Sequence, residues 1–258
     1  MSTAIITGAS RGLGLALARA LAHRGYRLVI DARGAPELQR AATELEAITH
    51  VRAVPGDIAD DWHRGALIDA AGERIDLLVN NASTLGPSPQ PELARYPLQA
   101  LQRVYDVNVV APLALAQLAV PLMPAGACLI NVTSDAAVEP YEGWGGYGSS
   151  KAALEQPTAI LAVEQPALRV YAVDPGDMRT QMHQEAFPGE DISDRPPPEE
   201  SVPGLIGLIE STLPSGRYRA HEVGGEVGGA VAGEVGGAVA GEVGGEVAGE
   251  VLAHGSAS

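Results

Sequence analysis

The only lysine of the chain, Lys151, follows Tyr147 by four residues. Residues four apart share one face of a helix, so the phenol and the ammonium would be neighbours in a helical segment. Tyrosine has an ordinary pKa of about 10, and acid/base work near neutrality needs it lowered by about 3 units, or roughly 4 kcal/mol. A positive charge about 4 Å away supplies about 4 kcal/mol at an effective dielectric constant of about 20. The pair therefore indicates an acid/base tyrosine activated by lysine, with chance juxtaposition as the alternative.

A second candidate site is the glycine-rich run Thr7-Gly8-Ala9-Ser10-Arg11-Gly12-Leu13-Gly14. It lies between a predicted strand and a predicted helix. Glycines there permit a tight turn and close backbone approach, and the free N–H groups of the helix favour an anionic pyrophosphate. The run predicts a dinucleotide phosphate site, and a plain tight turn is the alternative.

Both sites need a scaffold of alternating strands and helices, which the apolar patterning predicts. Near-continuous apolar runs indicate buried parallel strands at residues 3–7, 27–32, 51–54, 75–80, 127–133 and 168–174. Helical patterns occupy residues 12–24, 36–48, 98–123 and 147–163. This order predicts an α/β protein with a doubly wound parallel sheet, a Rossmann fold, whose ligands lie beyond the carboxyl ends of the strands. The single cysteine, Cys128, falls within a strand and is expected to be a core residue.

The motifs, taken in order, resemble the short-chain dehydrogenase/reductase family over roughly residues 3–220. The resemblance implies an oxidoreductase that moves a hydride between a nicotinamide cofactor and a small carbonyl or alcohol substrate. The motifs that carry it are the Thr7-Gly8 to Gly14 glycine spacing, Asn80-Asn81-Ala82, Asn108, Ser134 thirteen residues before Tyr147, Tyr147 with Lys151, and Pro175-Gly176.

The same resemblance implies four catalytic residues. Tyr147 would be the acid/base, and Ser134 would hydrogen-bond the substrate oxygen as negative charge develops. Asn108 would hold a water that links Lys151 to solvent, which makes the lysine a member of a proton relay. A compact ammonium with rotatable donors suits that relay better than a guanidinium. A catalytically weak nucleotide-binding regulator or scaffold, which uses the C-terminal repeat at residues 222–258 for interaction, is the alternative function, although a pure binder need not keep all four residues.

The end of the second predicted strand bears on the choice of cofactor. An acid there bonds the adenosine ribose in NAD enzymes, whereas an arginine meets the 2′-phosphate of NADP. By resemblance the discriminating position is Ala32, followed by Arg33, and strand alternation should turn Asp31 to the opposite face. Arg11 in the glycine run is a second base suited to a phosphate. We predict NADP(H), with NAD(H) as the alternative.

The family pattern implies further cofactor contacts. Asp57 and Ile58 would hold the adenine, Asn80 and Ala82 would pack along the nucleotide, although Ser83 stands where the family usually has glycine. Pro175, Gly176 and Thr180 would hold the carboxamide. The predicted cofactor site comprises Gly8, Ser10, Arg11, Gly12, Leu13, Gly14, Arg33, Asp57, Ile58, Asn80, Ala82, Tyr147, Lys151, Pro175, Gly176 and Thr180. No metal site is predicted.

Three segments are expected to form the walls of the substrate pocket: residues 83–97, 135–144 and 181–203. The stretch at about 180–202 is rich in proline and acid. It is a candidate substrate lid, with an exposed surface loop as the alternative.

The formal net charge of −15 argues against a nucleic-acid partner. No signal stretch or run of 18 or so apolar residues is evident, so we expect a cytoplasmic protein without a membrane partner. The dinucleotide-binding domain is predicted at residues 1–221. From Glu222 a Glu/Ala-Val-Gly/Ala-Gly tetrapeptide repeats, and residues 222–258 are predicted to be a flexible, low-complexity tail because they offer little apolar surface to bury.

Family members commonly dimerise through the helix that carries the tyrosine. Pro157 falls inside that predicted helix, where it removes a hydrogen bond and can kink the helix. A homodimer is predicted rather than a tetramer, because little after Ser215-Gly216-Arg217-Tyr218 resembles the C-terminal segment of tetrameric members.

Overall fold

The computed structural model describes residues 1–224. The predicted flexible tail falls mainly on residues 225–258 and so lies outside the described residues. Its first three residues belong to the helix Ala220–Gly224 (α9), and Val223 is buried against the neighbouring core. The folded body therefore extends to the start of the repeat.

A seven-stranded parallel sheet in the order β3-β2-β1-β4-β5-β6-β7 forms the centre of the molecule. Helices cover both faces of this sheet, so both sets of side chains along a strand are buried. The strands therefore read as continuous apolar runs without alternating polar residues. The strands are β1 (Thr3–Ile6), β2 (Arg27–Ala32), β3 (Val51–Pro55), β4 (Leu77–Asn80), β5 (Cys128–Val132), β6 (Arg169–Asp174) and β7 (Gly216–Arg219).

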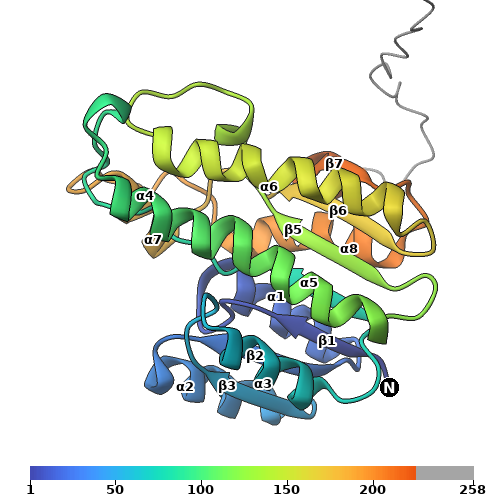
Figure 1. Cartoon of the computed structure of the whole chain (residues 1–258). Helices are drawn as coiled ribbons and strands as arrows, with labels where there is room; N and C mark the ends of the chain where they lie inside the picture. Colours follow the sequence, from blue (N-terminus) through green and yellow to red (C-terminus); the bar gives the residue numbers. More distant parts are fainter. Residues whose placement is uncertain (225–258) are drawn as a thin grey trace, which may run out of the picture.

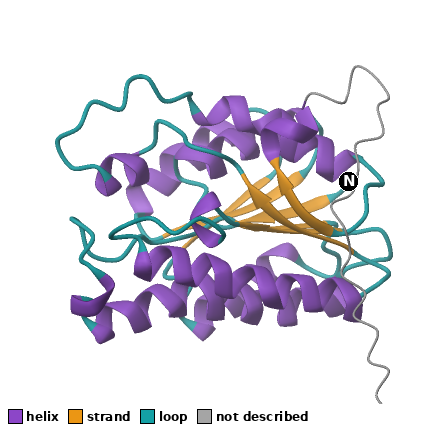
Figure 2. Ribbon diagram, turned by 90° about the horizontal axis from the view of Figure 1, so that it is seen from above, coloured by secondary structure: helices purple, strands orange, loops and turns teal. Residues whose placement is uncertain are grey.

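Helices connect these strands and cover both faces of the sheet (Figures 1 and 2). The helices are α1 (Gly12–His23), α2 (Ala35–Glu46), α3 (Asp61–Ala71), α4 (Leu98–Tyr105), α5 (Ala111–Ala119), α6 (Gly145–Glu164), α7 (Gln181–Ala186), α8 (Val202–Glu210) and α9. Short 3-10 turns lie at Leu93–Arg95, Val120–Leu122, Asp135–Ala137 and Pro198–Ser201, and a π-helical turn at Asp106–Val110.

Two apolar cores lie on opposite faces of the sheet. Apolar side chains of α1, α2 and α8 pack on one face, among them Leu17, Leu45 and Leu205, each at most 1% exposed. Side chains of α3 and α5, such as Leu67 and Leu115, pack on the other. Full burial of one such side chain contributes about 1.5–3 kcal/mol, so the two cores hold the strand ends firmly in place.

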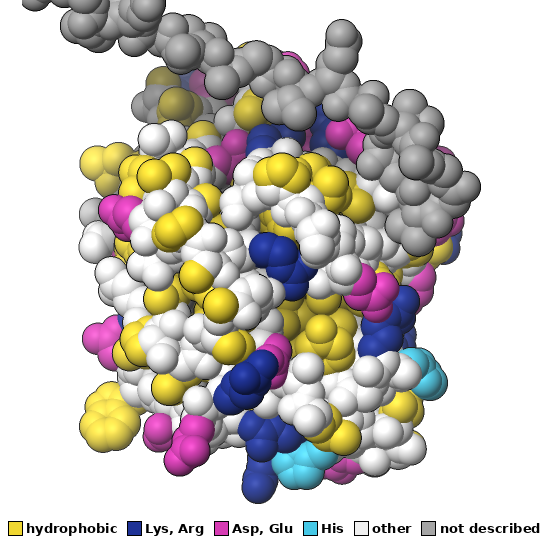
Figure 3. Space-filling view, turned by 90° about the vertical axis from the view of Figure 1, so that its right-hand side faces the viewer, with side chains coloured by type: hydrophobic (Ala, Val, Ile, Leu, Met, Phe, Trp, Pro, Cys, Tyr) yellow, Lys and Arg dark blue, Asp and Glu magenta, His cyan; other side chains and the backbone are white. Residues whose placement is uncertain are grey.

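Strand order reverses between β1 and β4, which pair with each other at the middle of the sheet. The loops that leave the carboxyl ends of these two strands run to opposite sides, and a crevice opens between them. Figure 3 views the opposite end of the molecule, where the strands begin; basic, acidic and hydrophobic side chains are intermixed there.

The long helix predicted at residues 98–123 is divided into α4, the π turn, α5 and a 3-10 turn. The stretch Leu98–Leu122 is long and apolar enough to cross a membrane by length and composition alone. Its buried residues Val107, Ala111 and Leu115 pack on the sheet. Helix α6, by contrast, runs without a break through Pro157.

Candidate active site

A cleft of about 1300 Å³ opens at the carboxyl ends of the strands. The glycine run forms one side, and the end of β5 and the start of α6 form its floor. Helix α7, from the predicted lid segment, forms another wall. All predicted site residues line this cleft except Gly14, Asn80 and Asn108.

The glycine run follows β1 and leads into α1. Gly8 and Gly12 have φ angles of +67° and +57°, which side-chain-bearing residues rarely adopt. A Cβ on Gly14 would approach the Gly8 carbonyl oxygen and Asn81 Nδ2 to 2.6 Å each, so this glycine is required for packing behind the loop. The loop leaves the first turn of α1 open toward the cleft, which fits a pyrophosphate.

Asp31 is occupied beneath this loop. Its Oδ1 accepts from the Gly8 N–H at 2.6 Å, and its Oδ2 lies 2.8 Å from Nε2 of the buried His63. The carboxylate is therefore engaged by protein groups and is only 2% exposed. Arg33 and Arg11 are exposed and line the cleft, and Arg11 donates to Gln181 at the start of α7.

The predicted adenine end carries an ion pair that the sequence did not reveal. Arg103 of α4 donates to Asp57, whose other oxygen accepts from the Ala59 N–H at 3.0 Å. Partial burial acts to raise the pKa of Asp57, but the bonds from Ala59 and Arg103 hold it below its ordinary value. Asp57 is thus a fixed anion beside Ile58.

The last residue of β4, Asn80, and the two residues that follow it point in different directions. Asn80 is 3% exposed and turns away from the cleft, with Nδ2 donating to Asn131 Oδ1 at 2.8 Å. Asn81 faces the glycine run, where its Nδ2 donates to the Thr7 carbonyl at 2.8 Å. Ala82 lines the cleft as predicted. Asn80 therefore supports the cleft from behind, and Asn81 is the asparagine at its surface.

The segment after β6 crosses the cleft toward the glycine run. Gly176 has a φ of +76°, and its N–H donates to Asp174 Oδ1 at 3.0 Å. Thr180 caps α7 by accepting from the His183 N–H at 3.2 Å. The Thr180 methyl lies 3.6 Å from where a Cβ on Gly12 would stand, so the two predicted ends of the cofactor site face each other.

Tyr147 lies in the first turn of α6, 7% exposed, on the floor of the cleft. Burial raises the pKa of its phenol, and the hydroxyls of Ser134 and Ser83, which lower it, do not offset that effect. The predicted lowering of the tyrosine pKa by lysine is wrong for the protein alone, because desolvation outweighs every favourable contact. The phenol is protonated at neutral pH.

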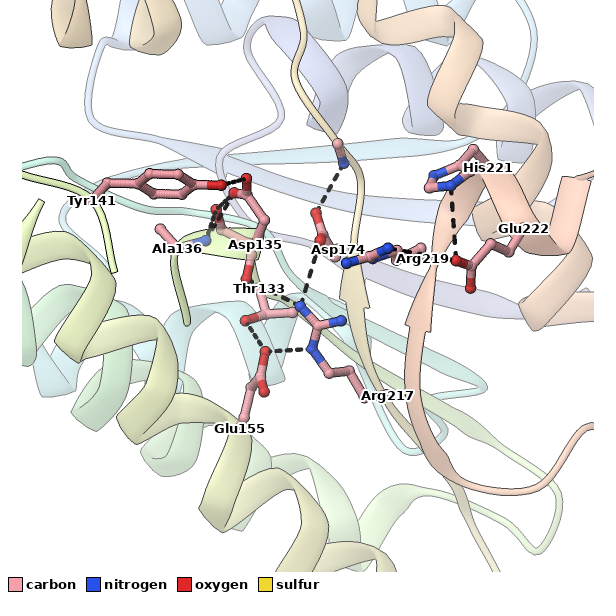
Figure 4. A network of polar contacts seen from close by, with 12 residues as sticks. Thr133, Asp135, Ala136, Tyr141, Glu155, Asp174, Arg217, Arg219, His221 and Glu222 are labelled. Atoms are coloured by element: carbon pink, nitrogen blue, oxygen red, sulfur yellow. Dashed lines mark hydrogen bonds and ion pairs between the residues drawn. The ribbon is translucent and has the colours of Figure 1, made fainter. Parts of the chain in front are cut away.

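Lys151 lies one turn further along α6 and is 2% exposed. Its Nζ is 5.4 Å from the centre of the Tyr147 ring and donates to the Val132 carbonyl at 2.8 Å. Burial lowers the pKa of the ammonium to about 8, although Glu155 acts to raise it. Glu155 is itself held by Thr133 and by Arg217, which donates to it at 2.9 Å (Figure 4).

Asn108 sits in the π turn between α4 and α5. Its Oδ1 accepts from the Thr84 N–H at 2.9 Å and the Ser83 hydroxyl at 3.1 Å, and its Nδ2 donates to Ser150 Oγ at 2.9 Å. The side chain thus ties the loop after β4 to α6. Through Ser83, which also touches the Tyr147 phenol, it is connected to the predicted acid/base.

A nucleotide-sized crevice at the sheet switch point, with a glycine cradle and a tyrosine, serine and lysine on its floor, defines a dinucleotide-binding α/β oxidoreductase. The model of the short chain dehydrogenase family matches residues 2–191. The chain belongs to the short-chain dehydrogenase/reductase family, and it is an oxidoreductase of that family.

Curated relatives share about a third of their residues with this chain. A Pseudomonas aeruginosa 3-oxoacyl-[acyl-carrier-protein] reductase of rhamnolipid biosynthesis is 34% identical, and the match covers 69% of this chain and 73% of the relative. A Saccharomyces cerevisiae benzil reductase, (S)-benzoin forming, is also 34% identical, over 70% and 73%. An Eggerthella lenta 3beta-hydroxysteroid dehydrogenase is 32% identical, over 85% and 87%.

Solved structures share the fold. A Shigella flexneri 2a short chain dehydrogenase in complex with NADP superimposes with a TM-score of 0.77 at 26% identity, covering 85% of this chain and 96% of that one. An Escherichia coli CFT073 short chain dehydrogenase in complex with NADPH gives a TM-score of 0.75 at 26% identity, over the same shares. Short-chain dehydrogenases of this architecture thus bind a nicotinamide cofactor.

Proposed function

We propose that the protein is an NADP(H)-dependent oxidoreductase that interconverts a small carbonyl compound and its alcohol, with Tyr147 as the acid/base. The observation that carries the proposal is the convergence of Tyr147, Ser134 and Lys151 on the floor of the cleft that also holds the glycine run. Family membership and the relatives' reductase and dehydrogenase names support this class of reaction.

The residues fit a nicotinamide dinucleotide. Gly8 and Gly12 line the cleft, and a Cβ on Gly12 would meet only the Thr180 methyl, at 3.6 Å, so a pyrophosphate can approach the backbone there. Arg11 and Arg33 offer guanidinium groups beside this cradle, whereas Asp31 is engaged by Gly8 and His63. These contacts, and the NADP-bound structural relatives, support NADP(H) over NAD(H). Bound NADPH would supply the hydride.

The protein supplies the proton and the charge stabilisation. The protonated phenol of Tyr147 donates to the carbonyl oxygen as the hydride reaches the carbon, which gives the alcohol. Ser134 donates a hydrogen bond to the same oxygen while charge develops. With a pKa of about 8, Lys151 remains largely cationic at neutral pH and is able to return a proton toward Tyr147. This last role rests on the family resemblance.

A panel of aldehydes, ketones and alcohols, assayed with NADPH/NADP⁺ and NADH/NAD⁺, tests the proposed reaction and cofactor. We expect turnover with at least one carbonyl class and a preference for NADPH.

Arg33→Ala should lower kcat/KM for NADPH by about tenfold or more, since a charge-assisted phosphate contact is lost, and leave NADH turnover unchanged. Arg52→Ala, also in the N-terminal half, is the control. Equal use of both cofactors would refute the NADP assignment, and inactivity on every class would favour a nucleotide-binding regulator.

We also propose a homodimer. The outer face of the α4–α5 stretch exposes Val110, Leu113 and Leu118, and α6 exposes Ile160 and Val163, the last at 81%. Helices α4 and α6 lie side by side on the same face of the sheet (Figure 1). An apolar surface of this kind favours association with a second copy.

A further inference from the structure

The carboxylate of Asp135 follows Ser134 directly and lies in the part of the cleft near Tyr147, Trp144 and helix α7, here called the substrate half. Its Oδ1 accepts from the Ser134 hydroxyl at 2.8 Å and from the Ala136 N–H at 2.8 Å. Its Oδ2 accepts from the Tyr141 hydroxyl at 2.9 Å (Figure 4). Within residues 1–224, no basic side chain forms an ion pair with it. Asp135 is therefore a cleft carboxylate held only by neutral donors.

The bond between Ser134 and Asp135 bears on the proposed reaction. A hydroxyl has one proton to donate, and here that proton is directed to a carboxylate. Hydrogen bonds to an ionised acceptor are about twice as strong as neutral ones. A plain ketone must therefore compete with Asp135 for the Ser134 proton, and success leaves one carboxylate oxygen with a donor missing.

A substrate with its own donor beside the carbonyl removes this conflict. When the carbonyl oxygen takes the Ser134 proton, a hydroxyl or ammonium on the neighbouring carbon is able to donate to Asp135. The carbonyl oxygen and such a donor are about one hydrogen-bond length apart. That spacing matches the 2.8 Å between Ser134 Oγ and Asp135 Oδ1.

The rest of this half of the cleft selects an apolar body. Trp144 packs edge-on against Tyr147, with ring centres 5.7 Å apart, and is 5.9 Å from the Phe187 ring. Leu85 and Met182 belong to the same cluster. The other titratable groups that line this half are the acids Glu142, Asp174, Asp177 and Glu185 and the bases Lys151, Arg179 and His183, so acids outnumber bases there and a carboxylate-bearing substrate is disfavoured.

We propose that Asp135 is a specificity-determining residue that selects apolar or aromatic ketones carrying a hydrogen-bond donor, hydroxyl or ammonium, on the carbon next to the carbonyl. The corresponding products are vicinal diols and amino alcohols. This inference rests on the proposed function, since it describes the substrate of the same site.

Matched aromatic probes test the inference. With NADPH, 2-hydroxyacetophenone is compared with 2-methoxyacetophenone, which lacks the donor, and with phenylglyoxylate, which is anionic. We expect wild-type kcat/KM to favour the hydroxyketone over the methoxyketone by about tenfold or more, since a hydrogen bond to a charged group is at stake. In Asp135→Asn and Asp135→Ala this ratio should fall to about threefold or less, and relative activity on phenylglyoxylate should rise. Replacing the hydroxyl by an amino group should preserve the wild-type preference.

Glu139→Gln is the matched control, because this carboxylate lies four residues further along but outside the cleft. It should keep the wild-type ratio. A hydroxyketone-to-methoxyketone ratio that is the same in wild type and both Asp135 variants would overturn the inference while leaving the proposed function in place.

A binding measurement separates the two proposals. 1-Phenylethane-1,2-diol and its terminal methyl ether are titrated into the NADP⁺-loaded protein, without any need for turnover. Tighter binding of the diol than of the ether, lost in Asp135→Asn, supports the inference. If no ketone is reduced at the same time, that failure counts against the proposed reaction alone. Equal binding of diol and ether by the wild type would contradict the inference.

Discussion

At the scale of single residues, the floor of the cleft is built from side chains that burial holds away from their ordinary protonation behaviour. The Tyr147 pKa is raised and the Lys151 pKa is lowered to about 8, in each case mainly through desolvation. Each shift favours the neutral form, so both residues are costly to charge. Such paired perturbations in a cleft are typical of catalytic groups.

Lys151 should therefore destabilise the fold below pH 8. The folded state binds its proton more weakly than the unfolded state, so stability rises with pH between about 8 and 10.5. Lys151→Met should raise the melting temperature at pH 7, because it removes the cost of burying the ammonium, at most about 3 kcal/mol. The loss of the hydrogen bond to Val132 reduces this gain. The gain should vanish as pH approaches 10.5.

Thermal unfolding at several pH values measures this effect. Gln156→Met, an exposed change on the same helix, should give no pH-dependent difference from wild type. The quantity to compare is the melting temperature of Lys151→Met minus that of wild type. A lower value of this difference at pH 7 than at pH 10 would show that the ammonium stabilises the fold.

At the scale of elements, the strands and the glycine run were predictable because their signals are local. The apolar runs at residues 3–7, 27–32 and 51–54 became β1, β2 and β3 with ends shifted by one residue or less. Helix α3 was not predicted, since its sequence mixes charged and apolar residues. Nor was the π turn around Asn108, because the sequence pattern of residues 98–123 indicates one continuous helix.

The site residues, like the strands, were predicted in part. The helical spacing of Tyr147 and Lys151, and the family resemblance for Ser134, were enough to expect that the three residues meet, and all three line the cleft. The contacts of Asp135, Ser83 and Arg103 were not, because their directions depend on turns and on helices distant in sequence. Ser83 alone gave a signal, as a departure from the family glycine.

Helix α6 contains a proline in its interior, and the effect of that proline on stability can be measured. Pro157 lacks an N–H to donate to the preceding turn, yet the helix runs on to Glu164. Because the backbone there is already helical, Pro157→Ala should raise the free energy of unfolding, by up to about 3 kcal/mol. Chemical denaturation measures the change. The control Pro36→Ala, near the start of α2, should not stabilise the protein, since a first-turn proline costs no hydrogen bond. If Pro157→Ala lowers the free energy of unfolding instead, the proline ring contributes packing that outweighs the missing hydrogen bond.

At the scale of the whole molecule, the proposed dimer covers the exposed apolar side chains of α5 and α6. Val163→Glu should convert the dimer into monomer, because it buries a charge without a partner. Light scattering coupled to size-exclusion chromatography measures the mass in solution. Ile48→Glu, an exposed apolar residue after α2 on the other layer, should remain dimeric. A monomeric wild type, or a dimer unaffected by Val163→Glu, would contradict this interface.

We propose Tyr147 as the proton donor for carbonyl reduction. The most direct measurement is the rate of NADPH oxidation by Tyr147→Phe, on the best ketone or aldehyde found for the wild type, together with NADPH binding to the same variant. We expect the variant to bind NADPH within about twofold of wild type and to show a kcat lower by about 10²-fold or more, because a general acid is lost. A variant that binds NADPH and keeps wild-type kcat would show that Tyr147 is not the proton donor.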